Sequence, residues 1–299
     1  PTRVSLDGDV LLEAPAASDT TWEPSGSWHH DAGIAGDGEA IWALAEEKVP
    51  DGDVEWKGFV VKKLDLASGE TLWAWSSVDD GVASGALEPG DRYDVDPWHA
   101  NAVWDVVEDG VEKLYVSLRG ESQILRIDVE TRAVDLRVGL YGDLTLLDAT
   151  GAPATDDQWF FGQHDVKRFG DRLVVYDNGL GRDLHGSAPW SRALVLLLDE
   201  DAGTARIETG WRGDSDWASP AWGGLDRRDD GRLDVAIGHF WWVDEDSPQR
   251  STLAVLDPDG EGGAAVGWRV VFPDQDVALY RSEHLADPCG FFPIEAYCF

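Results

Sequence analysis

The sequence of 299 residues contains no methionine, two cysteines and few basic residues. It carries 24 Lys and Arg against 58 Asp and Glu, so the formal net charge is -34. A field of this sign repels phosphate backbones and anionic lipid headgroups. The longest apolar runs, such as 193–198, fall far short of the roughly 18 residues that a membrane-spanning helix needs. We therefore expect no nucleic-acid partner and no membrane insertion.

The scarcity of cysteine and methionine bears on where the protein works. Because the chain begins at Pro1 and lacks methionine, we expect a processed product whose export signal is missing. Cys289 and Cys298 lie near each other in a tail of residues 286–299. Neighbouring thiols pair in an oxidising compartment, so we expect a disulfide that pins this tail in a periplasmic, cell-surface or extracellular protein. The alternative is two unpaired thiols in a reducing cytosol.

The sequence does contain enough apolar and aromatic residues to fill a large core between β-sheets. It is 43% apolar and contains 16 tryptophans, which excludes an intrinsically disordered chain. Short runs rich in β-branched residues recur between Gly, Asp and Asn turns, and sustained 3.6-residue periodicity is nearly absent. This pattern predicts an all-β fold, with one domain over residues 1–285.

The predicted strands repeat. Four units each hold about four strands in roughly 70 residues, and they open at His29, His99, Gln163 and Ala221. Four-stranded antiparallel units in a row are typical of the blades of a β-propeller. Runs 3–6 and 10–12, together with 277–281, would complete a closing blade. We therefore count five blades, and a sixth could lie within 140–157 or be lost with the N-terminus.

Histidines recur at equivalent places in these units. In a propeller the innermost strands converge, so His30, His99 and His164, which lie at the starts of three such strands, should point to one place. The second strands return to the same end, where they and the following loop bring further polar side chains: Arg119, Asn178, Arg182, His185 and His239. Imidazoles and guanidiniums in one concave mouth bind an anion or supply a nucleophile and acid–base groups.

Metal binding is the alternative interpretation of these residues. Three histidines can hold zinc or copper, but no HExxH or CxxC spacing is present, and the neighbouring arginines would repel a cation. Separately, Asp226, Asp230 and Asp234 resemble an acidic calcium loop and are candidates for a structural calcium site. Arg228 stands where a third carboxylate is wanted, so an acidic hairpin turn is the favoured interpretation. No other cofactor is expected.

Several short motifs resemble those of the bacterial arylsulfate sulfotransferases. The resemblance spans about residues 28–285, and the motifs follow in the same order. They are Asp96-Pro97-Trp98-His99-Ala100-Asn101, Val116-Ser117-Leu118-Arg119, Phe161-Gly162-Gln163-His164-Asp165, Tyr176-Asp177-Asn178-Gly179 with Arg182 after it, and Ala278-Leu279-Tyr280-Arg281.

The resemblance implies a six-bladed, exported propeller that moves a sulfo group from a phenolic sulfate ester to a phenol through a sulfohistidine, without a nucleotide donor. By position, His239 matches the nucleophile. His99, His164 and Arg182 match residues that hold the sulfo oxygens, and Asn101 and Asn178 would orient them. Arg119, His30 and His185 are further substrate-binding candidates.

A second class of function stays open. A secreted propeller could bind a ligand or partner, or build a surface assembly, without catalysis. The place of His239 separates the two hypotheses: a position within reach of His99 and His164 favours the enzyme, and an outward position favours the binding protein.

Overall fold

The computed structural model describes residues 2–4, 10–13, 28–51, 54–88, 95–188, 190–212, 219–238, 251–272 and 279. Over these residues the protein is built from antiparallel sheets with three short helical turns, which confirms the all-β prediction. In the described part of the chain, no helix is long and apolar enough to cross a membrane.

The first two sheets are four-stranded, and each strand pairs with its neighbour in the chain. The first sheet contains β3 (Trp28–Ile34), β4 (Ala40–Asp51), β5 (Val54–Asp65) and β6 (Thr71–Ser76), and a turn of π-helix, η2 (Ser77–Val82), follows it. The second contains β7 (Ala100–Glu108), β8 (Val111–Leu118), β9 (Gln123–Asp128) and β10 (Val134–Gly139).

The third and fourth sheets repeat the plan. The third contains β12 (His164–Phe169), β13 (Arg172–Asp177), β14 (Arg192–Asp199) and β15 (Thr204–Trp211), with short helices η3 (Asp156–Gln158) and η4 (Arg182–His185) in its loops. The fourth contains β16 (Gly224–Arg227), β17 (Leu233–Ile237), β18 (Thr252–Pro258) and β19 (Ala264–Val271).

The four repeated units of the sequence are therefore confirmed, while one detail of the blade count changes. The segment 140–157 contains β11 (Thr145–Leu147), which adds to the outer edge of the third sheet as a parallel partner of β15 and starts no sheet of its own. Near the N-terminus, β1 (Thr2–Val4) pairs with β2 (Val10–Glu13). The expected C-terminal partner strand, 277–281, lies outside the described residues apart from Leu279, as do Cys289 and Cys298.

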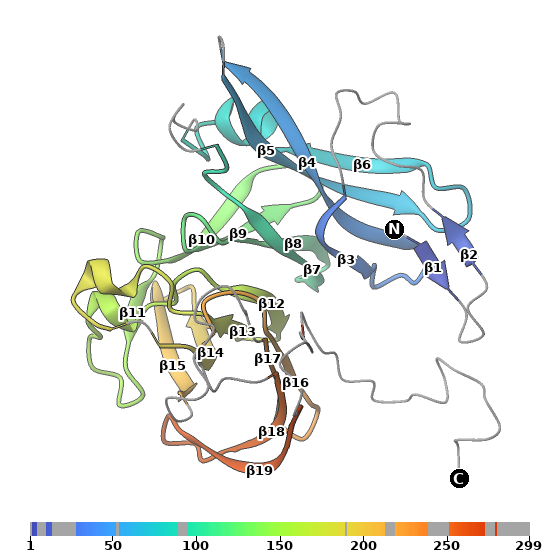
Figure 1. Ribbon diagram of the computed structural model, residues 1–299. Coiled ribbons are helices and arrows are strands. Elements are labelled where there is room, and N and C mark those ends of the chain that lie inside the picture. Colours follow the sequence, from blue (N-terminus) through green and yellow to red (C-terminus); the bar gives the residue numbers. More distant parts are fainter. Residues whose placement is uncertain are drawn as a thin grey trace, which may run out of the picture.

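Consecutive sheets lie side by side through their first strands. β3 contacts β7, β7 contacts β12, and β12 contacts β16. Figure 1 shows these four strands towards the middle of the molecule, with the last strands β6 and β19 at the outside. Residues at the start of each first strand are thereby brought near one another.

Side chains alternate between two cores because each inner sheet is covered on both faces. On β8, Leu114 and Val116 pack in the core shared with the first sheet, whereas Tyr115 packs towards the third. On β13, Leu173 faces the second sheet and Val174 the fourth. The two-residue period of a strand produces this division, and it explains why these strands are apolar at nearly every position.

Candidate functional site

The first strands are irregular where their histidines lie. The pairing register shifts between Trp28 and Ala32 in β3, and between His164 and Lys167 in β12. His30 has φ +56° and His99 has φ +45°, a left-handed conformation that costs energy for residues other than glycine. Bulges of this kind redirect side chains at the rims of sheets.

Two of the predicted histidines meet across the first and second sheets. His30 Nε2 lies 2.9 Å from His99 Nε2, and His99 Nδ1 lies 2.6 Å from Asp96 Oδ2. Because the carboxylate accepts the Nδ1 hydrogen, a neutral His99 presents the lone pair of Nε2. The His29 ring also lies in this group, 3.8 Å from the His30 ring and 5.5 Å from that of His99. We call His29, His30 and His99 the histidine cluster.

Burial lowers the pKa of two members of the histidine cluster, His29 and His30. Desolvation, followed by the neighbouring histidines, lowers the pKa of His30 to about 3. Desolvation also lowers the pKa of His29, which Glu46 partly offsets. His164 is among the charges that act on His30, so the third sheet contributes its histidine to the same region.

His164 is buried and held by one amide. Its Nδ1 lies 2.7 Å from Asn178 Oδ1, and Asn178 Nδ2 donates to the carbonyl oxygens of Ser219 and Trp222. Two carbonyl acceptors identify Nδ2 as the donor end of the amide, so Oδ1 accepts the Nδ1 hydrogen of His164. The structure thus gives His164 an orienting partner, as the sequence led us to expect of Asn178.

A repeated polar link joins the first strands, and it was missed at the sequence level. Asp31 Oδ2 accepts a hydrogen bond of 2.8 Å from the Val103 amide, and Asp165 Oδ2 accepts one of 2.8 Å from Leu225. Asn101 occupies the equivalent place in the second sheet, where Nδ2 donates to Gln163 O at 2.7 Å. The shared signal was the polar residue one or two positions after each histidine. Asn101 therefore fastens two sheets together.

Arg182 has a different environment from the one expected. It is fully buried, Nη2 donates to Asp177 Oδ2 at 2.5 Å, and Nη1 donates to the carbonyl oxygens of Asp157 and Trp159. Its guanidinium carbon lies 3.6 Å from the centroid of the Trp190 ring. These contacts hold the loop after β13. In this conformation the guanidinium is not open to a sulfo group.

Arg119 and His185 both line a neighbouring pocket of about 370 Å³. The His185 ring lies 4.9 Å from that of Phe161, and Leu180 adds a further apolar wall. The backbone amide of Arg119 donates to His99 O at 3.2 Å, so this pocket opens beside the histidine cluster. His239 lies outside the described residues.

The three calcium candidates do not form a ligand group among the described residues. Asp234 binds Arg228 through both oxygens at 2.7 and 2.5 Å, and Asp230 binds Arg232. Asp226 pairs in register with Asp234 on neighbouring strands and accepts the amide of Arg227. This segment forms the hairpin turn between β16 and β17, and its arginines Arg228 and Arg232 pair with Asp234 and Asp230.

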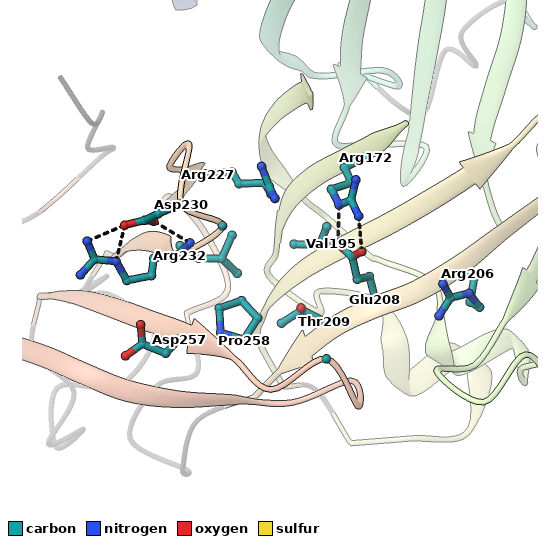
Figure 2. Close-up of a pocket in the computed structure, with 13 residues that line it drawn as sticks. Arg172, Val195, Arg206, Glu208, Thr209, Arg227, Asp230, Arg232, Asp257 and Pro258 are labelled. Atoms are coloured by element: carbon teal, nitrogen blue, oxygen red, sulfur yellow. Dashed lines mark hydrogen bonds and ion pairs between the residues drawn. The ribbon is translucent and has the colours of Figure 1, made fainter. Parts of the chain in front are cut away.

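A pocket of about 390 Å³ lies at the opposite end of the third and fourth sheets, near the β16–β17 turn (Figure 2). Two of its arginines are bound to carboxylates, Arg172 to Glu208 and Arg232 to Asp230. It contains no histidine. It is separate from the site formed by the first strands.

The comparisons with known proteins bear on this arrangement. The family model for arylsulfotransferase (ASST) matches residues 23–233, well over half of the 299 residues. The chain belongs to the arylsulfotransferase family. The matched part of this arylsulfotransferase-family chain contains the histidine cluster, His164 and Arg182, and it ends before His239.

No curated protein matches the chain. Among solved structures, a protein of unknown function from Bacteroides caccae is 13% identical, with a TM-score of 0.50 over 94% of this chain and 77% of that one. The GH43_1 enzyme from Xanthomonas citri, complexed with xylotriose, is also 13% identical, with a TM-score of 0.46 over 86% of this chain and 77% of that one. At 13% identity the likeness to the Bacteroides caccae protein concerns the fold alone.

Proposed function

We propose that this protein transfers a sulfo group from an aryl sulfate to a phenol through a sulfohistidine, without a nucleotide donor. The observation that carries the proposal is the convergence of His30, His99 and His164 from three consecutive sheets in a chain of the arylsulfotransferase family. The repeated sheets, adjoining through their first strands, support a β-propeller with these residues at one mouth of its channel.

The reaction has two steps, each a displacement at sulfur. The Nε2 lone pair of the nucleophilic histidine attacks sulfur, the bond between sulfur and the aryl oxygen breaks, and the phenolate leaves with that electron pair. The acceptor phenol then loses its proton and attacks the sulfohistidine, which frees the imidazole. The proton released from the acceptor balances the one taken up by the departing phenolate. Splitting the transfer in this way is the advantage of covalent catalysis.

We assign the nucleophile to His239 because of its position in the sequence. The geometry of the described residues favours a role for His99 and His164 in holding the sulfo group. Asp96 and Asn178 hold the two Nδ1 atoms, so the Nε2 atoms are aimed by fixed partners. Both imidazoles would then line the sulfo group, whose oxygens carry negative charge in the transition state.

The pocket with Arg119 and His185 fits the aryl part of a substrate. Phe161 and Leu180 offer apolar contact, and the Arg119 guanidinium offers charge to an anionic ester. Its place next to His99 would bring a bound ring close to the histidines. Export of the protein and a Cys289–Cys298 disulfide are further proposals, to be tested by mass spectrometry of the unreduced chain from its native compartment.

The test is release of a coloured phenol from an aryl sulfate, with and without an acceptor phenol. Wild type should release it in an acceptor-dependent way with ping-pong kinetics. His239→Ala should lose turnover, while His185→Ala should mainly raise KM. Turnover that survives in His239→Ala but is lost in His164→Ala or His99→Ala would move the nucleophile to that residue. A folded wild type that turns over no phenol would overturn the enzyme and leave a ligand-binding protein.

A further inference from the structure

The histidine cluster has the composition of a transition-metal site. Ligating nitrogens of His29, His30 and His99 all lie within 4.8 Å of one another. Two residues come from β3 and one from the segment before β7, so two sheets hold the group from both sides. It is the one such group of three or more His, Cys, Asp or Glu side chains within the described ranges.

The separation of the nitrogens is close to what zinc requires. Two nitrogens bound to one tetrahedral zinc, each at about 2.0–2.1 Å, lie about 3.3 Å apart. His30 Nε2 and His99 Nε2 are 2.9 Å apart. A shift of a few tenths of an ångström therefore makes room for an ion between them. The hydrogen shared by the two Nε2 atoms would then move to Nδ1 of the ring that carries it.

A carboxylate lies close to each of two of the imidazoles, as is common in metal sites. Asp96 Oδ2 accepts from His99 Nδ1 at 2.6 Å, which fixes the ring and makes Nε2 a stronger ligand. Glu46 Oε1 lies 3.7 Å from His29 Nε2. A net charge of -34 attracts cations to the surface as a whole.

One of the arginines that argued against a metal at the sequence level, Arg182, is bound elsewhere. Arg182 is buried, and its guanidinium contacts Asp177, the carbonyl oxygens of Asp157 and Trp159, and the rings of Phe161 and Trp190. A pocket of about 240 Å³, lined in part by His29, His30 and Asp31, leaves space beside the histidines for a fourth ligand.

We propose that His29, His30 and His99 bind one zinc-type divalent ion, with a fourth position open to water or an anion. Three histidines with an open position form a recurrent class of zinc site. The site shares His30 and His99 with the residues proposed for sulfo transfer, and it adds His29, which has no role proposed in that reaction.

The experiment measures metal binding by the full chain without a polyhistidine tag and without any sulfate ester. Zn²⁺ is titrated against a chromophoric chelator, and Co²⁺ is followed by its visible absorption. Wild type should bind one ion per chain and give the intense band of four-coordinate Co²⁺. His29→Ala and His99→Ala should abolish this band, and Asp96→Asn should weaken affinity by about 10–100-fold.

His185→Ala is the matched control, since it removes a histidine from the neighbouring pocket and should leave binding unchanged. Far-UV circular dichroism verifies that each variant is folded, and His29→Gln replaces any alanine variant that is not. The proposal is overturned if folded wild type gives no four-coordinate Co²⁺ band, or if His29→Gln and His185→Ala bind with equal affinity. Aryl sulfate turnover is assayed separately, so either hypothesis can fail alone.

Discussion

The Nδ1 atom of His164 lies 2.7 Å from Oδ1 of Asn178, and the amide of Asn178 is itself held by two backbone carbonyls. One side chain thus ties the histidine of the third sheet to the segment that leads into the fourth. Its amide end cannot turn round without placing an oxygen against two carbonyl oxygens. The orientation of the His164 ring therefore depends on contacts between sheets.

The first prediction concerns this pair. Asn178→Ala frees the His164 ring, so kcat for aryl sulfate turnover should fall by about 100-fold with a smaller change in KM, because misplaced reacting groups cost rate. Ser191→Ala is a graded comparison: Ser191 Oγ bonds the backbone oxygen of Asn178 and the Ser219 carbonyl that holds the amide, so its loss should lower kcat less than Asn178→Ala. An Asn178→Ala enzyme with the kcat of wild type would contradict this role.

The second prediction concerns Arg182. Its removal leaves the buried Asp177 carboxylate with Arg192 as its remaining charged partner. Arg182→Ala should therefore lower the free energy of unfolding by about 3–5 kcal/mol, measured by denaturant titration. Arg232→Ala, which breaks an exposed pair with Asp230, should change it little. Lost turnover with unchanged stability in Arg182→Ala would instead assign the guanidinium to the substrate.

The third prediction concerns the buried pair of Asp165 and Lys167, whose Nζ lies 2.9 Å from both carboxylate oxygens. Lys167→Met leaves a buried charge and should cost about 3–5 kcal/mol of unfolding free energy. Adding Asp165→Asn removes that charge and keeps an acceptor for the Leu225 amide. The double variant should therefore be more stable than Lys167→Met alone, and a double variant of lower stability would refute the argument.

The fourth prediction concerns acid. Lys113, together with hydrogen bonds from Thr131, holds the pKa of Asp128 well below its usual range. Such a group adds stability above its unfolded-state pKa of about 4, and this stability is lost as the pH falls through the lower folded-state pKa.

Asp128→Asn should therefore unfold more easily than wild type at pH 7, by about 1 kcal/mol. The difference should shrink as the pH falls below 4 in parallel denaturant titrations. Ala202→Ser, in the exposed turn between β14 and β15, removes no titratable group and is the control. A difference in unfolding free energy between Asp128→Asn and wild type that stays constant to low pH would rule out this source of stability.

Strand positions, turns and the order of the motifs could be predicted because they depend on neighbours in the chain. Side chains on β8 alternate in direction along the strand, and Asp109 and Gly110 form a turn in which both residues have positive φ. Both features follow from local preferences, which the tertiary contacts leave unchanged. The meeting of histidines also followed from sequence, because repeats that stack in the same way place equivalent residues together.

The tertiary structure decided which side chains bind to one another. Arg182 is bound to Asp177, the carboxylates of Asp230 and Asp234 are bound to arginines, and His29 lies within the histidine cluster. Each outcome depends on where a bulge turns one strand and on which charge lies nearest once the sheets pack. The sequence by itself determined which residues reach this end of the fold, whereas side-chain direction and burial, which depend on contacts far apart in the chain, determined what each one binds.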